Sequence, residues 1–356
     1  MSTGSRSDED ATAEDGAGGG DRRMGVGVRT SDLSDERLAY LAQLGIENVF
    51  VDTVRESDPD GLGLRPDAVP DVGTLIRTRN RLEDAGLRMA GIQSLSGYMY
   101  EDVMFGREDA EDQTEAIKRL LRNMGRAKVP VLGYQWNPRS VPGMFMTTSQ
   151  SARVRGGARA REFDLSEVDD PATSSDPDAP DYDEAAFWER YESFLREVIP
   201  VAEAADVRMA LHPADPPTID RLEGVPRLFR DPAAFERAMD VVDSEYNGIK
   251  LCLGCFSEMG EDVPATIERF GDRTVFVHFR DVIGTMPAFQ ETFVDDPEGN
   301  FDSLAAVRAL DDAGFDGVVV PDHVPRVEGD TDWGHRARGH AAAYLKGLIR
   351  AVDDGE

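Results

Sequence analysis

The strongest constraint on the fold is a series of eight short apolar segments, each followed by a longer amphipathic stretch, from residue 24 onwards. Short apolar runs are typical of parallel strands that are buried on both faces, and amphipathic stretches are typical of the helices that cover such a sheet. The series therefore predicts an α/β fold, a (β/α)8 TIM barrel. The predicted strands are 24–29, 48–53, 88–93, 131–136, 207–212, 249–253, 274–279 and 317–321. The predicted helices are 35–44, 71–85, 108–126, 183–205, 232–242, 263–270, 302–313 and 334–352.

An open, doubly wound sheet is the alternative architecture. Such a sheet usually has a glycine-rich phosphate loop after its first strand, and the sequence shows none there. Glycines at positions 45, 86 and 314 precede predicted strands, as expected where a helix ends and feeds the next strand. The barrel remains the leading prediction.

The chain divides into a tail and one domain. Residues 1–23 are rich in Gly, Ser, Ala and acidic residues without apolar periodicity, which predicts a disordered acidic tail. Residues 24–356 form the predicted single barrel domain, with a long insertion at 139–182 after the fourth strand. The part of the insertion at 149–161 is basic, and we expect it to fold over the active site as a lid. The acidic part that follows is expected to be a solvated excursion.

Charge limits the classes of partner. The chain has 356 residues and a formal net charge of −30, which would repel nucleic acids and anionic membranes. It contains no run of about 18 apolar residues, no secretory signal and only two cysteines, so we expect a cytoplasmic protein. Only four of its 39 basic residues are lysines, and the acids are spread along the chain. This composition predicts a halophilic protein, because concentrated salt screens self-repulsion.

Candidate metal ligands stand at the ends of the last four predicted strands. These residues are His212, Cys252, His278 and Asp322, the last followed by His323. Because the active site of a TIM barrel lies at the carboxyl ends of its strands, we expect these side chains to meet. Two imidazoles, a thiolate and a carboxylate suit Mn²⁺, Fe²⁺, Co²⁺ or Zn²⁺, whereas Ca²⁺ prefers oxygen ligands alone.

Each of these residues also has a plainer interpretation. A histidine near a strand end is often satisfied by the backbone, and a buried cysteine is often an inert small apolar residue. Cys252 and Cys255 form a CxxC pair, which could indicate a redox pair or half a zinc site. The joint occurrence at four successive strand ends favours the metal site.

Other polar residues at strand ends are candidate substrate-binding groups. Arg280 lies two residues after His278, on the same face of the strand, and its guanidinium would suit a substrate carboxylate. A salt bridge is the alternative role for Arg280. Trp136 and Tyr134 could instead be aromatic residues of the hydrophobic core. The further candidates are Arg29, Gln93 and Asn137.

These motifs together resemble the mannonate dehydratases, a family of xylose-isomerase-like barrels. The resemblance starts with a helix leading into a strand that ends in His-Pro-x-Asp-Pro-Pro, here 212–217, and it covers most of the chain from Met24 on. The other matching segments are Tyr134–Pro138, Asn247-Gly248, Cys252, His278-Phe279-Arg280, Pro321-Asp322-His323 and Leu345-Lys346-Gly347-Leu348.

The resemblance implies dehydration of D-mannonate to 2-keto-3-deoxy-D-gluconate in hexuronate catabolism, with Mn²⁺ or Fe²⁺ as cofactor. It implies metal ligation by the four strand-end residues and an acid/base role for His323. Some family members have a catalytic tyrosine before the last helix, where this chain reads Arg338-Gly339-His340. We therefore expect His340 or Tyr344 to be the second acid/base.

The expected chemistry is loss of water from a sugar acid. The C2 proton is only weakly acidic, so a cation that stabilises the enediolate is needed, together with a base for this proton and an acid for the C3 hydroxyl. Two other functions stay open: a metal-dependent sugar or sugar-acid isomerase or epimerase, and a sugar-acid binding protein without catalysis. The expected partners are a small sugar acid and further copies of the chain, in a dimer or tetramer.

Overall fold

A computed structural model describes residues 24–52, 62, 64–138, 140–141, 147–174 and 182–355 of the chain. The predicted tail, residues 1–23, lies outside the described residues, as do parts of the predicted insertion.

Eight parallel strands close into a barrel in the order β1-β14-β11-β10-β7-β4-β3-β2. β1 pairs with both β2 and β14, which closes the sheet and excludes the open doubly wound alternative. The predicted (β/α)8 fold is thus confirmed. The strands are β1 (Gly25–Thr30), β2 (Asn48–Val51), β3 (Arg88–Ile92), β4 (Val131–Tyr134), β7 (Arg208–Leu211), β10 (Asn247–Cys252), β11 (Thr274–His278) and β14 (Val318–Val320).

The barrel interior is filled by side chains from these strands. The rings of Phe50 and Phe276 stack with their centroids 4.2 Å apart. Next to Phe276, the buried Lys250 donates from Nζ to the backbone oxygen of Gln93 at 2.8 Å. The interior is therefore a packed core rather than a pore, and it closes the barrel beneath the strand ends.

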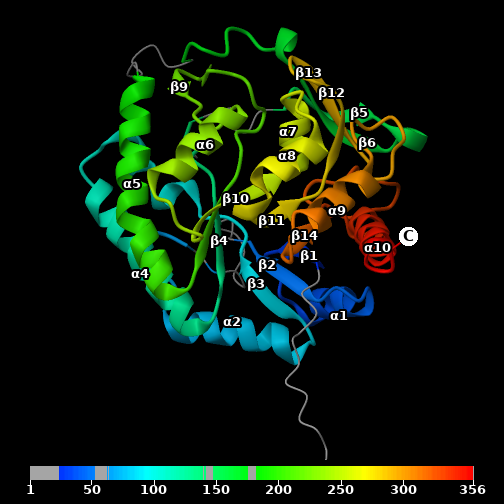
Figure 1. Ribbon diagram of the computed structural model, residues 1–356, viewed down its shortest axis with the longest axis horizontal. Helices are drawn as coiled ribbons and strands as arrows, with labels where there is room; N and C mark the ends of the chain where they lie inside the picture. The colour runs from blue at the N-terminus through cyan, green and yellow to red at the C-terminus, as the bar shows by residue number, and fades with distance from the viewer. Residues whose placement is uncertain are drawn as a thin grey trace, which may run out of the picture.

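The helices surround the barrel (Figure 1). Aspartate side chains cap several of them by accepting a hydrogen bond from a backbone N–H in the first turn, at positions 71, 183, 231, 262 and 302. Because an N-cap carboxylate also complements the helix dipole, part of the acidic composition has a local structural use. The helices are α1 (Asp35–Gln43), α2 (Val72–Asp84), α4 (Ala110–Ala127), α5 (Glu184–Ala205), α6 (Pro232–Val241), α8 (Val263–Phe270), α9 (Ser303–Asp312) and α10 (His335–Asp353). Shorter elements are η1 (Gly97–Met99), α3 (Glu101–Phe105), η2 (Arg155–Gly157), η3 (Leu165–Glu167), β8 (Arg221–Leu222), β9 (Val225–Pro226), α7 (Leu253–Glu258) and η4 (Gly271–Arg273).

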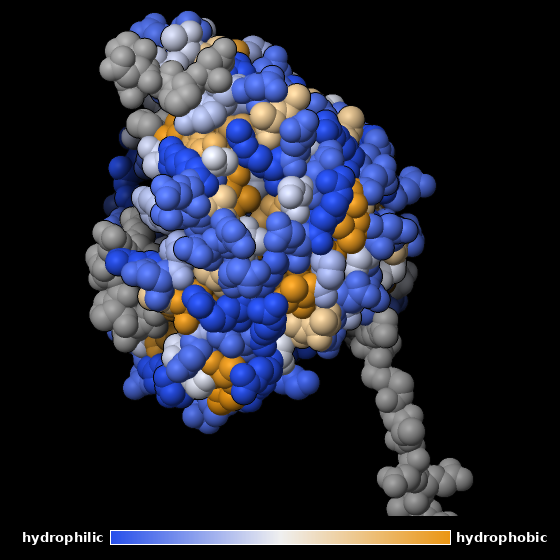
Figure 2. Space-filling view, turned by 90° about the vertical axis from the view of Figure 1, so that its left-hand side faces the viewer, coloured by the Kyte–Doolittle hydropathy of each residue, from blue (hydrophilic) through white to orange (hydrophobic). Residues whose placement is uncertain are grey.

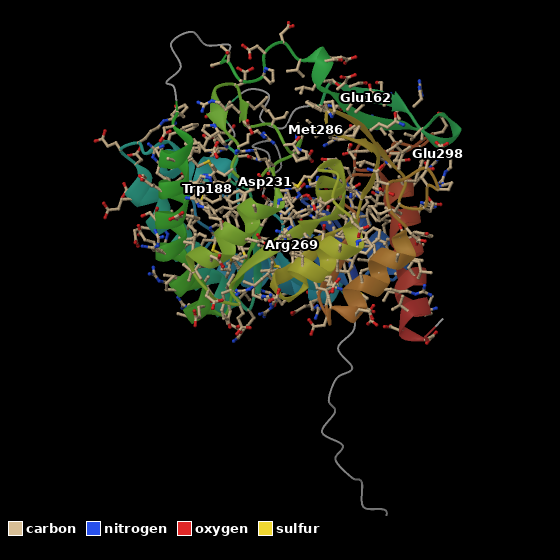
Figure 3. The ribbon with its side chains drawn as sticks, turned by 45° about the horizontal axis from the view of Figure 1, so that its top comes forward. Glu162, Trp188, Asp231, Arg269, Met286 and Glu298 are labelled. Atoms are coloured by element: carbon tan, nitrogen blue, oxygen red, sulfur yellow. The ribbon has the colours of Figure 1, made fainter. Side chains whose placement is uncertain are left out.

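A second, antiparallel sheet was not predicted. Its order is β12-β13-β6-β5, formed by β5 (Ser149–Arg153), β6 (Arg159–Asp164), β12 (Asp281–Thr285) and β13 (Ala288–Thr292). β12 begins three residues after β11 ends, so the sheet lies at the carboxyl end of the barrel, where Figure 3 shows Glu162 and Met286. β5 and β6 are short and rich in polar or charged residues, which explains why no strand pattern was visible in them.

Two backbone contacts fix β6 over the barrel. On one side, β6 pairs with β13, with Glu162 opposite Gln290. On the other, Arg159 and Arg326 exchange two backbone hydrogen bonds, of 3.0 and 2.7 Å. The basic half of the insertion is thus attached both to the excursion after β11 and to the loop after β14.

The outer surface is mainly polar. Figure 2 shows polar side chains over most of one face, with apolar side chains in scattered groups. Among the described residues, no helix has the length and apolar character needed to cross a bilayer.

Candidate active site

The four predicted metal ligands meet at the carboxyl end of the barrel. Cys252 and His278 end β10 and β11 as direct cross-strand partners, His212 follows β7, and Asp322 lies two residues beyond β14. All four are buried, and each offers one ligand atom within 4.8 Å of those of the other three. The strand order β14-β11-β10-β7 brings them together, because these strands are neighbours in the barrel.

The hydrogen bonds of the two imidazoles suit metal binding. His212 donates from Nδ1 to the backbone oxygen of Pro213 at 2.8 Å, and its buried Nε2 has no hydrogen-bond partner among the described residues. In His278, Nε2 lies 2.7 Å from the Gln93 side chain. The buried Nδ1 lies 3.4 Å from Asp322 Oδ2 and makes no hydrogen bond within the part of the chain that the structure describes. Each ring is therefore oriented through one nitrogen and has the other available, as in histidines that bind metals.

The charges of the cluster are also those of a ligand set. Burial alone would raise the pKa of Cys252, but a hydrogen bond from Cys255 and the charge of Arg280 bring this pKa well below its usual value. Burial likewise opposes ionisation of Asp322, yet the neighbouring His278 and His323 hold its pKa well below the usual range. Burial lowers the pKa of His212 and keeps it neutral. A thiolate, a carboxylate and a neutral imidazole are the forms that bind divalent metals.

His323 lies at the edge of this cluster and is oriented by a glutamate. Its Nδ1 donates to Glu291 Oε1 at 2.6 Å, and its Nε2 lies 3.6 Å from Asp322 Oδ2. Burial opposes ionisation of Glu291, but the charges of His323 and Arg280 lower its pKa. An ionised Glu291 fixes the proton on Nδ1 and leaves the lone pair of Nε2 directed away from the glutamate.

Glu291 was missed from the sequence. It belongs to β13, which follows no apolar alternation, and it stands 32 residues before its partner. The burial of Glu291 follows from the pairing of β13 with β12, so it could be predicted only once this hairpin was known.

Arg280 is enclosed by groups of the protein itself. It is 1% exposed, and its guanidinium donates to Glu258 Oε1 at 2.5 Å, to Asp215 Oδ2 at 2.8 Å and to Cys255 Sγ at 3.2 Å. Its Nη1 also lies 3.5 Å from Glu291 Oε1. Arg280 therefore lies near His278, as predicted, but the carboxylates that it binds are those of Glu258 and Asp215 rather than that of a substrate.

The other predicted substrate-binding residues have different surroundings. Arg29 is half-buried at the end of β1, with Nε 3.6 Å from Asp322 Oδ1 and Nη1 3.9 Å from Asp52 Oδ1. Trp136 is buried against aromatic rings, including that of Tyr191 at 5.0 Å, and no described residue accepts a hydrogen bond from its Nε1. Asn137 follows it and is also buried.

The structure does not bring His340 or Tyr344 to the cluster. His340 lies on α10 with its side chain 43% exposed, 3.4 Å from Asp295 Oδ2 and edge-on to Phe293. Tyr344 is one turn further along α10, partly buried, and burial raises its pKa. Neither residue has a described contact with the four ligands or with His323.

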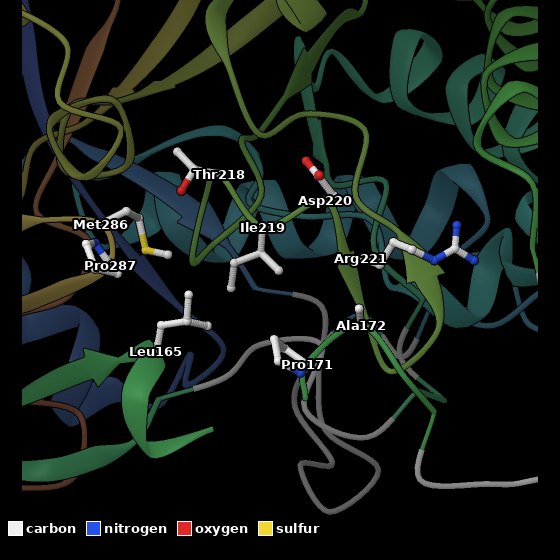
Figure 4. Close-up of a pocket in the computed structure, with 9 residues that line it drawn as sticks. All are labelled: Leu165, Pro171, Ala172, Thr218, Ile219, Asp220, Arg221, Met286 and Pro287. Atoms are coloured by element: carbon white, nitrogen blue, oxygen red, sulfur yellow. The ribbon is translucent and has the colours of Figure 1, made fainter. Parts of the chain in front are cut away.

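A separate hollow lies beside the second sheet (Figure 4). Its volume is about 470 Å³, and its lining is mainly apolar. None of the four predicted ligands and no part of the His323–Glu291 pair borders it, so it is distinct from the cluster of candidate ligands. The lining residues are Leu165, Pro171, Ala172, Thr218, Ile219, Asp220, Arg221, Met286 and Pro287.

Comparisons with known proteins identify relatives of this chain. The family model described as "D-mannonate dehydratase (UxuA)" matches residues 36–176 and 179–356. The chain is 31% identical over 309 residues to the mannonate dehydratase of Streptococcus suis (strain 05ZYH33), covering 78% of this chain and 81% of that one. It is 30% identical over 309 residues to that of Streptococcus pneumoniae (strain 70585), with the same coverage of each chain.

Solved structures show the same fold. The crystal structure of mannonate dehydratase from Streptococcus suis serotype 2 aligns with a TM-score of 0.81 and 26% identity, over 94% of this chain and 95% of that one. An L-ribulose 3-epimerase aligns with a TM-score of 0.55 at 15% identity, over 94% and 98% of the two chains. The second likeness concerns the barrel fold alone.

Proposed function

Because this chain belongs to the D-mannonate dehydratase family, we propose that it is a hydro-lyase that converts D-mannonate to 2-keto-3-deoxy-D-gluconate. The observation that carries the proposal is the convergence of His212, Cys252, His278 and Asp322 next to an imidazole that is not itself in the ligand set. Dehydration of a sugar acid needs a cation site and an acid/base group next to each other.

The four ligands would hold Mn²⁺ or Fe²⁺. Their donor set of two nitrogens, one sulfur and one oxygen, with two buried ring nitrogens free of hydrogen bonds, fits such a cation. The bound cation would supply Lewis acidity that stabilises negative charge on the substrate. The chain's part is to keep the thiolate and carboxylate ionised and to fix the ring planes through Pro213 and Gln93.

His323 is the proposed base. Its Nδ1–H donates to the Glu291 carboxylate, so its Nε2 has the lone pair that can accept the C2 proton. Once His323 has taken this proton, it becomes an imidazolium that lies against the ionised Glu291. The carboxylate of Glu291 then stabilises the positive charge, as an acidic partner of a catalytic histidine does.

We assign the second proton transfer to His323 as well. The C2 carbanion expels the C3 hydroxyl, and the imidazolium returns a proton to that group, so that water leaves and His323 is neutral again. The product is an enol that becomes the 2-keto acid. His340 and Tyr344, the partners expected from the sequence, have contacts elsewhere, with Asp295 and on α10.

The test is product analysis with the metal-loaded protein. Protein incubated with Mn²⁺ and D-mannonate should form a keto-deoxy acid that gives a thiobarbiturate colour after periodate oxidation. An isomerase or epimerase would convert the sugar acid without this product, and a binding protein would leave D-mannonate unchanged. Either result would refute the proposal.

A further inference from the structure

Arg161 is a cationic residue next to His323 that has no role in the proton transfers proposed above. It lies on β6, between the backbone pairing of Arg159 with Arg326 and that of Glu162 with Gln290. The backbone on both sides is therefore fixed to the loop that follows His323 and to the strand that contains Glu291. This anchoring places the Arg161 side chain at the imidazole.

The contacts of Arg161 differ from those of Arg280 and Arg29, which also lie near the ligands. Its Nη1 lies 3.0 Å from His323 Nε2 and 3.4 Å from His323 Nδ1. Arg280 is bound to two carboxylates, and Arg29 lies within 4 Å of two. Among the residues that the structure describes, no ion pair is present for Arg161, which is also exposed. Its guanidinium is therefore accessible to an anion from solution.

We propose that Arg161 binds the carboxylate of the substrate, and so selects sugar acids over neutral sugars. The inference rests on the proposed function, because it concerns the same site. A guanidinium binds a carboxylate through two parallel hydrogen bonds, which fixes the position of the attached carbon. Arg161 touches the nitrogen that takes the C2 proton, and C2 is the carbon next to the carboxylate. A carboxylate on Arg161 therefore places C2 against His323 Nε2.

The position of Arg161 leaves the base free to act. Its Nη1 lies within 3.4 Å of both ring nitrogens of His323, which places it over the imidazole and away from the axis of the Nε2 lone pair. Nε2 can therefore take the C2 proton while the guanidinium binds the carboxylate. A neutral sugar offers no carboxylate to this guanidinium.

The charge distribution of the chain supports this role. With a net charge of −30, the protein repels an anionic substrate at long range. Residues 153–161 contain four arginines and no acid, and they span the end of β5, the turn at η2 and the start of β6. Among these arginines, Arg161 has its guanidinium at the His323 imidazole, where it can bind an anion that reaches the cluster.

Three variants test the proposal: Arg161→Gln, Arg161→Lys and the control Arg153→Gln. Arg153 is in the same hairpin, but its Nη1 donates to the backbone oxygen of Gly157, away from His323. For each Mn²⁺-loaded protein, KM and kcat for D-mannonate are measured, together with calorimetric affinity for D-mannonate and for the neutral D-mannitol. Arg161→Gln should raise KM and weaken D-mannonate binding by about 10- to 100-fold. Arg161→Lys should restore part of both, and Arg153→Gln should change neither.

Binding of D-mannitol should be equal in all variants, because it has no carboxylate. An unchanged affinity of Arg161→Gln for D-mannonate would overturn the proposal, and so would an equal loss for both ligands. If the wild type bound D-mannonate through Arg161 but formed no keto-deoxy acid, the proposed function would fail while this inference stood.

Discussion

The barrel and the second sheet contribute to the active site in different ways. Strands β7, β10, β11 and β14 of the barrel supply a buried set of four ligands, each at or just after a strand end. The sheet β12-β13-β6-β5 supplies Glu291 and Arg161, which contact His323 from two sides. The proposed metal ligands are therefore supplied by the barrel strands, whereas the residues proposed to assist proton transfer and to bind the substrate carboxylate are supplied by the second sheet.

The largest loss of activity is expected when one of the four predicted metal ligands at the barrel strands is replaced. Asp322→Asn removes the carboxylate ligand with little change of shape, so metal binding should weaken by more than the roughly 10- to 100-fold typical of outer-shell changes. Turnover should become undetectable. Dialysed protein is assayed for metal content and for the cobalt-substituted absorption spectrum, with circular dichroism as the control for folding. Full metal content in this variant would contradict the assignment of Asp322.

Changes to His323 or to Glu291 of the second sheet should lower kcat without lowering metal content. His323→Asn should lower kcat by about 10³-fold, the middle of the range for a lost acid/base group, and leave metal content unchanged. Glu291→Gln should lower kcat less, by about 10- to 100-fold, because the amide oxygen still accepts from Nδ1 but lacks the charge that stabilises the imidazolium. Retained turnover in His323→Asn would exclude its role.

The attachment of the sheet should respond to pH through Asp281. This residue begins β12, is 1% exposed and accepts backbone hydrogen bonds from Val282 and Asn300, and burial raises its pKa to about 7. Since the folded pKa lies above the usual value of 3.8, the native state binds the proton more tightly. Ionisation of Asp281 therefore lowers the free energy of unfolding above pH 7. This destabilisation disappears as the pH falls from 7 towards 4.

The variant Asp281→Asn keeps the acceptor oxygen and removes the ionisation. Relative to the wild type, its free energy of unfolding should rise between pH 4 and 7, by at most about 4 kcal/mol for a shift of about three pKa units. Denaturant unfolding at several pH values measures the difference, and the exposed Asp35→Asn controls for net charge. A difference that is independent of pH would disprove the buried ionisation.

The smallest effect is expected on α10, outside both regions. His340→Asn and Tyr344→Phe should change kcat by no more than about twofold, since surface substitutions away from a site have small effects. Steady-state kinetics with D-mannonate measures this. A loss as large as that of His323→Asn would show that α10 reaches the active site and that His323 has a second acid/base partner.

The sequence by itself predicted the barrel and four side chains that meet at its carboxyl end. Buried parallel strands are continuous apolar runs, so their ends can be read within a few residues, and chain order brings the ends of successive strands to one mouth. His212, Cys252, His278 and Asp322 could be selected for this reason, as could His323, which follows Asp322 directly.

Only the tertiary structure decided which charges face these residues. Arg280 has the position that strand alternation predicts, but whether it binds substrate or Glu258 depends on α7, which packs beside it. Glu291 and Arg161 lie 32 and 162 residues from His323 along the chain, in short polar strands that have no local signature. Pairing between such strands is a long-range interaction, and a single sequence contains no periodicity that records it.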